Sequence, residues 1–401
     1  MIKSDKYWVT DGESFYDIKN PLNSIHFNWT GNYSGDYIQL SNAYFETART
    51  VIAAILNESS GHEKSDEWFF PAIYLYRQAI ELLCKGLLFL IIPKKEMPDY
   101  LKKYSHRIYD AFNIYLNTVG DAISLNITEC VWITNYLENL EYIDANSNLF
   151  RYPIREGYLS GFKDAFLDIV DMANGINQCY SIMYICFPLN YNPLKYSAEI
   201  DLSTRADVLY FASHGIRNCM LYDSPFDAGY YPHIQGYSKL AYFLIDRMPK
   251  NHCFFLPIAF LIRHAIELGL KCILVSRVEH GVMLNIQKKN INSHNLYKKL
   301  WSVVKEPIKY YADISNYDLS LVQLTDKYLC ELSKIDKEGK KFRYPTTNGL
   351  EYHFKNLTID YYQSIHWMIS VFNFLDGCTA MMEMAYDYEN QIRTEMKSEI
   401  Y

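Results

Sequence analysis

The chain has 401 residues, of which 49% are apolar and 21% charged, and its net charge is −7. This balance is ordinary for a globular protein of one large or two smaller domains, and the acidic charge argues against a protein that coats nucleic acid non-specifically. The nine cysteines are spaced irregularly and form no C-x-x-C pair, which disfavours a disulfide framework and a zinc ribbon. We find no signal peptide and no apolar run long enough for a bilayer, so we expect a cytoplasmic protein without a membrane partner.

Apolar residues recur at helical spacing along most of the chain, in long runs without Pro or Gly. The expected helices of the first half cover 37–56, 68–92, 105–117, 128–144 and 158–187. Those of the second half cover 233–248, 254–278, 293–306, 316–336 and 357–395. The segments 1–36 and 189–232 precede the two helical sets and carry turn formers, so we expect them to be irregular or to form short strands.

The two helical sets repeat one another. Residues 71–90 and 257–276 are identical at nine of twenty positions without a gap, where unrelated segments would share about one. Three further matches follow in the same order: Ala43-Tyr44-Phe45 with Ala241-Tyr242-Phe243, Ser105-His106 with Ser293-His294, and Phe150-Arg151-Tyr152-Pro153 with Phe342-Arg343-Tyr344-Pro345. The sequence therefore predicts a mostly α fold of two bundles, 1–190 and 191–401, packed as an intrachain pseudo-dimer.

Each copy carries three charged residues at four-residue spacing, which places them in one stripe on an otherwise apolar helix. We call them the first ladder (Arg77, Glu81 and Lys85) and the second ladder (Arg263, Glu267 and Lys271). A central helix cannot expose such a stripe, and buried charges need partners. One interpretation is a structural ion-pair ladder. The other is a polar pocket in which Arg and Lys hold a phosphate or a carboxylate.

Two further repeated features could complete such a pocket. Ser105 and Ser293 are predicted helix N-caps, which places His106 and His294 in the first helical turn. There the helix dipole lowers imidazole basicity, so that each ring serves as a base or an acceptor, or merely closes the helix start.

The proline of each Arg-Tyr-Pro sequence favours an extended tyrosine before it. Arg151 and Arg343 are therefore predicted to lie on fixed loops. A fixed guanidinium is a good fork for phosphate or carboxylate. The same loop could equally pin two helices together through a buried Tyr and an Arg–Glu pair.

The sequence lacks the phosphate loop G-x-x-x-x-G-K-[ST], the dinucleotide motif G-x-G-x-x-G, the zinc motif H-E-x-x-H and the hydrolase motif G-x-S-x-G. ATPase, dinucleotide oxidoreductase, zinc peptidase and α/β-hydrolase activities therefore have no support. We expect neither a metal nor a cofactor.

A long apolar helix with R-x-A-I-E-L-x-x-K, followed by S-H and later by R-Y-P, resembles the HEPN superfamily of helical domains in prokaryotic conflict systems. The resemblance covers about 37–187 and 233–395. It implies dimeric bundles whose cleft often cuts RNA, with roles in abortive infection, toxin–antitoxin pairs and CRISPR-linked immunity. The family's ribonuclease signature is Arg, four to six residues, then His. Only Arg247 and His252 fit it here, with a proline between them and no counterpart in the first copy.

The leading hypothesis is thus an antiviral defence or toxin-type protein with tandem HEPN-like domains that acts on RNA, as a metal-independent endoribonuclease, or binds a nucleotide. In that hypothesis His106 and His294 act as bases, and the two ladders bind the ligand. Arg151 and Arg343 stabilise the phosphorane. The alternative is a non-catalytic binding or regulatory module, or a helical scaffold, that engages a partner protein of the same defence system. Both hypotheses are compatible with a homo-oligomer.

Overall fold

The computed structural model describes residues 7–57, 63–120, 125–153, 158–162, 164–187, 201–215, 218–221, 229–279 and 288–399. Within them the chain is mostly helical, as the apolar spacing predicts. The helices before the predicted junction are α1 (Tyr33–Leu56), α2 (Glu63–Ile91), α3 (Met97–Lys103), α4 (Ile108–Val119), α5 (Ile127–Ile143) and α6 (Ile169–Ile185). Those after it are α7 (Tyr230–Leu244), α8 (His252–Glu279), α9 (Lys288–Ile291), α10 (Ser302–Ile314), α11 (Ser320–Ile335) and α12 (Tyr361–Glu399). The junction near 190 lies outside the described residues.

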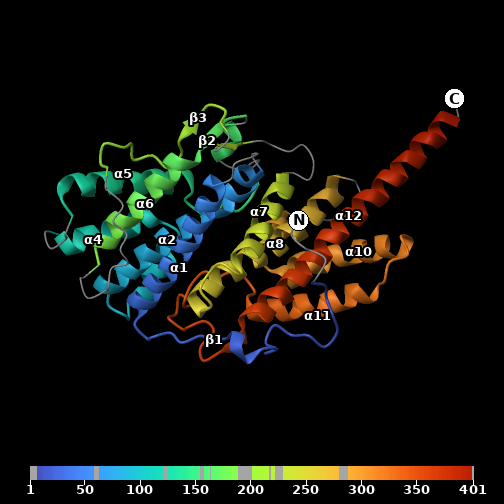
Figure 1. The fold of residues 1–401 in the computed structure, drawn as a ribbon, viewed down its shortest axis with the longest axis horizontal. Coiled ribbons are helices and arrows are strands. Elements are labelled where there is room, and N and C mark those ends of the chain that lie inside the picture. The colour runs from blue at the N-terminus through green and yellow to red at the C-terminus, as the bar shows by residue number, and fades with distance from the viewer. Residues whose placement is uncertain are drawn as a thin grey trace.

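The two helices that carry the ladders, α2 and α8, lie at the centre of the molecule (Figure 1). Every residue of 69–88 and of 255–274 is buried, so both helices are enclosed on all sides over more than five turns. Helix α1 packs along α2 and α7 along α8, and the pairs meet because α7 also contacts α2 and α1 contacts α8. The buried apolar residues of both halves accordingly form one continuous core. No helix within the described ranges is long and apolar enough to cross a membrane.

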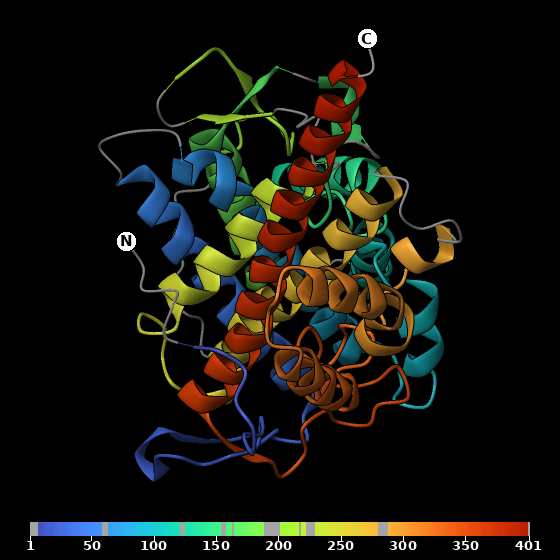
Figure 2. The same cartoon turned by 90° about the vertical axis from the view of Figure 1, so that its right-hand side faces the viewer.

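The outer helices cover this centre on two sides (Figure 1). Helices α4, α5 and α6 cover the first half, and α10, α11 and α12 cover the second. Helix α12 has 39 residues, and its C-terminal turns project beyond the rest of the molecule (Figures 1 and 2).

The segment that precedes each helical set packs on the opposite half of the chain. We call these two segments the first and the second arm. In the first arm, β1 (Ser24–His26) pairs antiparallel with β5 (Thr358–Asp360) next to α12, with Ile25 opposite Ile359. In the second arm, β3 (Phe211–Ala212) and β4 (Asn218–Met220) flank β2 (Phe166–Asp168) next to α6. Strands β1, β3 and β4 are the short strands expected in 1–36 and 189–232, whereas β2 and β5 lie in segments predicted to be helical. The arms therefore join the two halves, in addition to the contacts between the central helices.

Several helix boundaries differ from the sequence prediction. The single helix expected at 158–187 is a 3-10 turn (Tyr158–Phe162), strand β2 and α6, because Asp168 caps α6 by accepting from the backbone N–H three residues later. Asp360 similarly separates β5 from α12. The helix expected at 293–306 begins as a π-helical turn (Leu296–Trp301) and continues as α10. The short helices α3 and α9 were not predicted.

A close approach between the halves involves a glycine and a proline. Pro71 lies inside α2 and has no N–H to donate to the carbonyl oxygen of Glu67, four residues earlier. Gly236 of α7 lies against that carbonyl, where a Cβ would be only 2.0 Å from the oxygen. A side chain at 236 would force α7 away from α2.

We expect Gly236→Ala to lower the free energy of unfolding by about 1–3 kcal/mol, because α7 must move from a packed helix face. Gly269→Ala is the matched control, since its nearest neighbour is the Cβ of Leu375 at 3.9 Å. This second change should be neutral or stabilise the fold by roughly 0.5–1 kcal/mol, because alanine suits a helix interior better. Urea unfolding of both variants checks the prediction, and equal midpoints would contradict it.

Candidate functional site

The charges of each ladder pair along the buried face of a central helix, as their spacing predicts. In α2, the Glu81 carboxylate accepts hydrogen bonds from Arg77 one turn earlier and from Lys85 one turn later. In α8, Glu267 accepts in the same way from Arg263 and Lys271. All six side chains are buried, the most exposed being Lys85 at 7%. Each glutamate thus joins two cations that have almost no access to water.

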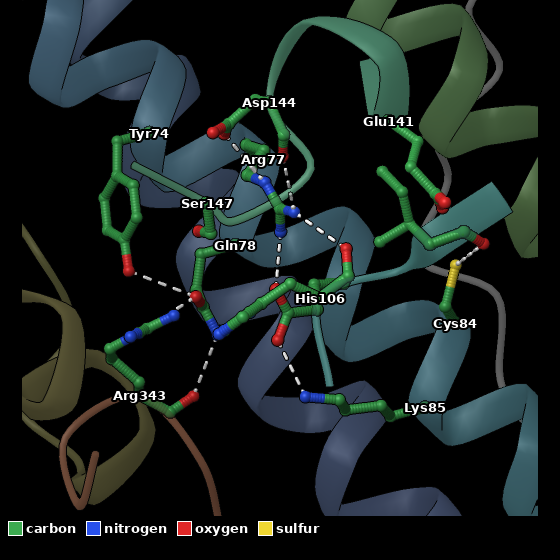
Figure 3. A network of polar contacts seen from close by, with 12 residues as sticks. Tyr74, Arg77, Gln78, Cys84, Lys85, His106, Glu141, Asp144, Ser147 and Arg343 are labelled. Atoms are coloured by element: carbon green, nitrogen blue, oxygen red, sulfur yellow. Dashed lines mark hydrogen bonds and ion pairs between the residues drawn. The ribbon is translucent and has the colours of Figure 1, made fainter. Parts of the chain in front are cut away.

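The two repeated histidines bind the same glutamates. Nδ1 of His106 lies 3.0 Å from a carboxylate oxygen of Glu81, and Nδ1 of His294 lies 2.9 Å from one of Glu267. The arginine of each ladder also donates to the histidine's backbone carbonyl, at 3.0 Å for Arg77 and 2.7 Å in the second half. Figure 3 shows Arg77, Lys85 and His106 of the first half converging from α2 and from the loop before α4.

The predicted helix caps are wrong. Helix α4 begins after Arg107, which makes no side-chain cap, and the turn before α10 is capped by Asn295, whose side chain accepts from a backbone N–H. His106 and His294 therefore lie just before their helices and outside the first turn. Each ring is positioned by its hydrogen bond to the ladder glutamate, which is a tertiary contact. The helix dipole does not position it, because the ring lies outside the helix.

A carboxylate that the sequence interpretation missed completes each ladder. Asp144 lies 3.1 Å from Nε of Arg77, and Asp336 lies 3.6 Å from Nε of Arg263. The second oxygen of each aspartate accepts two backbone N–H groups from the following loop. Both aspartates stand seven residues before the Arg of Arg-Tyr-Pro, so the repeated pattern D-x6-R-Y-P was a signal that could have identified them.

The Arg-Tyr-Pro segments are exchanged between the halves. The hydroxyl of Tyr344, from the second half, donates to Glu81 of the first ladder. The hydroxyl of Tyr152, from the first half, donates to Glu267 of the second ladder at 2.8 Å. The ladder lysines cover these rings, with Nζ of Lys85 4.1 Å from the Tyr344 ring centre and a similar contact in the other half. Each ladder is therefore incomplete without the opposite half of the chain.

The two arginines of these segments are not displayed at a surface. Arg151 is 5% exposed and Arg343 is 4% exposed. Arg151 donates to the Ser147 carbonyl and to a neighbouring amide, and Arg343 donates to the Gln78 side chain and to its neighbour Tyr344. Figure 3 shows Arg343 beside Gln78 and Tyr74 of α2. Both guanidinium groups have internal partners: that of Arg343 reaches across to Gln78 of the other half, whereas that of Arg151 bonds within its own half, and neither forms the expected Arg–Glu pair.

The exchanged backbone is held at equivalent points in both halves. Gln78 and His264 occupy the same position of the repeat, and each donates to the arginine carbonyl of the crossing segment, Arg343 and Arg151 respectively. The contact is therefore the same in both halves although the residue types differ. A glutamine amide and an imidazole N–H perform the same task at 3.2 and 2.9 Å.

A pair of tyrosines holds the phenylalanine carbonyls of the same segments. Tyr44 of α1 donates to the carbonyl of Phe342, and Tyr237 of α7 donates to that of Phe150. The matching sequence Ala-Tyr-Phe would have placed Tyr242 in this role, but its hydroxyl donates to a side chain of α12. The structural counterpart of Tyr44 is thus Tyr237, five residues before the Tyr242 that the sequence match indicates.

Burial and charge act in opposite directions on the ladder carboxylates. Burial alone would raise the pKa of Glu81 and of Glu267, but the surrounding lysine, histidine and arginine outweigh it and hold both pKa values well below the ordinary range. Burial lowers the pKa of His106, although Glu81 opposes the shift. Burial also lowers the pKa of Lys271 against the pull of Glu267. Both ladders therefore contain charged carboxylates neutralised inside the core.

The histidines are the only members of the two ladder sites that reach water to a useful extent. The side chain of His106 is 26% exposed and that of His294 is 42% exposed, whereas the ladder cations are buried and paired with internal carboxylates. The Nε2 atoms of both rings have no hydrogen-bond partner among the described residues. Chemistry at this site would therefore have to use Nε2 as the proton acceptor, with the buried carboxylate orienting the ring.

Arg247 and His252, which fit the ribonuclease spacing, do not join either ladder. Arg247 donates to the carbonyl of Phe243 and lies over its ring. His252 opens α8 and packs against the rings of Phe27 and Trp29. Within the described part of the chain, no group of three or more His, Cys, Asp or Glu residues has the arrangement of a metal site.

Removing either exchanged hydroxyl should destabilise the protein. Tyr344→Phe and Tyr152→Phe each delete a hydrogen bond to a buried charged carboxylate, and we expect a loss of about 1.5–3 kcal/mol per change. Tyr310→Phe, at a tyrosine that is 56% exposed, is the control and should change stability by less than about 0.5 kcal/mol. Urea unfolding measures all three. Values for the exchanged tyrosines as small as the control's would contradict their role.

Stability should fall as the pH drops below 6.5. Burial lowers the pKa of His233 and of His353 to about 4 and also lowers that of His106. Unfolding restores the ordinary pKa near 6.5, so the unfolded chain takes up protons that the folded chain refuses. The free energy of unfolding should then fall by about 1.4 kcal/mol per pH unit for each of His233 and His353 between pH 6.5 and 4, and His106 adds a loss in the same direction.

The depressed pKa values of Glu81 and Glu267 add a further loss below about pH 4.5, where the unfolded carboxylates protonate first. Urea midpoints at pH 7.5, 6.5, 5.5 and 4.5 test both ranges. A midpoint that stays constant from pH 7.5 to 5 would show that the histidines titrate alike in both states.

The chain matches no family model, no curated protein and no solved structure.

Proposed function

We propose that the two halves are HEPN-like domains fused into an intrachain pseudo-dimer, and that the protein is a non-catalytic helical scaffold which engages a partner protein. The resemblance places this role in a prokaryotic defence system. The observation that carries the proposal is the exchange of Tyr152 and Tyr344, each of which completes the buried ladder of the opposite half.

The exchange supports a fixed pseudo-dimer because neither ladder can be satisfied by its own half. Separating the halves would remove a hydroxyl donor from each glutamate and would uncover the Tyr74 ring that Arg343 contacts. Breaking a buried charged network costs several kcal/mol when one partner is removed. The polar network therefore holds the two bundles in one relative orientation, which suits a protein that presents surfaces of both halves to a partner.

The state of the cations supports a non-catalytic role. A phosphate site needs Arg or Lys groups that can exchange water for ligand oxygens. Here Arg77, Lys85 and their counterparts in α8 are buried and already bound to carboxylates. Arg151 and Arg343 likewise bind protein acceptors. Holding an RNA phosphate with these groups would require the core to open.

A second function, metal-independent cleavage of RNA, is favoured by one observation. His106 and His294 each hold Nδ1 against a buried carboxylate and are partly exposed, an arrangement that suits general acid–base chemistry at Nε2. Exposed lysines lie close to both histidines in the sequence, Lys102 and Lys103 in one half and Lys298 and Lys299 in the other, and could attract a phosphate backbone.

One experiment separates the two functions. The purified chain and its double variant His106→Gln, His294→Gln are incubated with a mixed RNA substrate in the presence of a metal chelator. The scaffold proposal expects no cleavage above background by either protein, and no growth arrest on expression that depends on the histidines.

Cleavage by the unchanged chain that falls at least 100-fold in the folded variant would overturn the scaffold proposal and support the second function. Circular dichroism and the urea midpoint of the variant confirm that it is folded. A further control changes only exposed lysines, Lys298→Gln with Lys299→Gln, which should weaken RNA binding without removing the acid–base group.

A further inference from the structure

The two halves differ in charge at equivalent positions. Residues 127–149 and 319–341 correspond to each other through the repeated aspartates Asp144 and Asp336. The first segment contains four acidic residues and no basic one, whereas the second contains four acidic residues and five lysines. None of the five lysines is buried. The difference therefore concerns what each half presents to its surroundings, because the buried ladders carry the same charges in both.

The lysines of the second half gather around its ladder arginine. Arg263 donates to the backbone carbonyl of His294 and lies beside Asp336, so the turn after the histidine meets the loop after the aspartate. That loop folds back onto α11, because Lys341 donates to the carbonyl of Lys334. Five exposed lysines on these segments form a surface that we call the basic rim: Lys298, Lys299, Lys334, Lys337 and Lys340.

The corresponding helix of the first half borders an acidic hollow. Glu138 and Tyr142 are exposed one turn apart on α5, and Tyr142 occupies the repeat position of Lys334. The hollow has a volume of about 480 Å³ and lies between α5 and the second arm. It is lined by Asn135, Glu138, Asn139, Tyr142, Ala206 and Asp207. We call these six residues the acidic face.

The acidic face has the groups that hold a lysine elsewhere in this protein. In the second ladder, Nζ of Lys271 lies 2.8 Å from a carboxylate oxygen of Glu267 and 4.4 Å from the ring centre of Tyr152. The two carboxylates and the tyrosine of the hollow offer the same combination at the surface. None of the six lining residues is basic. The hollow is therefore suited to a cation that comes from outside it.

A chain cannot place its own rim in its own hollow. Helices α5 and α11 lie on opposite sides of the central pair α2 and α8 (Figure 1). A second copy of the chain carries the same rim, and its lysines are complementary in charge to the acidic face. A contact between two different faces of identical chains joins them head to tail.

We propose that the acidic face of one copy of this chain binds the basic rim of a second copy. The ion pairs already present within these faces are exposed, Lys340 with Glu338 at 3.3 Å and Arg205 with Asp207 at 3.5 Å, and such pairs oppose docking only weakly. The contact is reversible and weakened by salt, because exposed charges select the partner. It does not depend on the proposed scaffold function, since no ladder residue takes part in it.

Sedimentation velocity of the full chain between about 1 and 100 µM, in about 50 mM and about 500 mM salt, measures this association. We expect species larger than the monomer at the lower salt and their loss at the higher. Glu138→Lys with Asp207→Lys should reduce the association constant at least about tenfold. Asp387→Lys with Glu395→Lys is the matched control, since it changes the net charge equally on the projecting turns of α12. It should leave association within about threefold of the unchanged chain.

Mixing two variants tests the direction of the contact. Lys334→Ser, Lys337→Ser and Lys340→Ser together remove charges of the rim and leave the acidic face intact. The variant with Glu138→Lys and Asp207→Lys has the converse defect. Each variant alone should stay monomeric, and their equimolar mixture should form dimers and nothing larger, because one intact face of each kind remains.

Circular dichroism and the urea midpoint verify that every variant is folded. A chain that stays monomeric to about 100 µM at the lower salt would overturn the proposal. The same conclusion would follow if the acidic-face variant associated as well as its α12 control, or if the mixture associated no better than its two components.

Discussion

A buried glutamate is the constraint on which each half of this protein depends. Glu81 accepts from an arginine and a lysine of its own helix, from a histidine of the next loop and from a tyrosine of the other half. A carboxylate inside a core is tolerated only if such donors replace the water it has lost. Helix α2, the loop before α4 and the crossing segment must therefore all be in place together. The same requirement acts on Glu267.

This constraint makes the two halves interdependent. The crossing segments carry the tyrosine donors. The arms, at 7–30 and at 201–215 with 218–221, pack on the opposite half, and α7 approaches α2 closely enough to require Gly236. Apolar packing supplies most of the stability of such a core, but it specifies orientation weakly. Hydrogen-bonded charges have narrow geometric requirements, so the ladders determine how the bundles sit against each other. We regard this as the physical basis of the proposed scaffold.

The same network limits what chemistry the site can perform. Cations that neutralise buried carboxylates cannot also bind a ligand phosphate without a rearrangement of the core. Only the imidazole edges of His106 and His294 remain accessible, and their differing exposure makes the two sites unequal. A repeated set of charged residues is therefore compatible with a purely structural requirement, because a duplicated fold must satisfy the same buried groups twice.

The sequence by itself determined the features that depend on local spacing. Four-residue intervals placed Arg77, Glu81 and Lys85 on one helix face, apolar periodicity located the long helices, and the internal match revealed the repeat. The caps predicted at Ser105 and Ser293 were wrong, because the loop conformation before each helix depends on the histidine's bond to the ladder glutamate and not on the residue type alone.

Only the tertiary structure decided that Tyr152 and Tyr344 cross to the opposite half and that Asp144 completes the first ladder. Those contacts join segments 67 to 263 residues apart. Such contacts arise from the docking of whole helices, whose relative positions the local pattern does not encode.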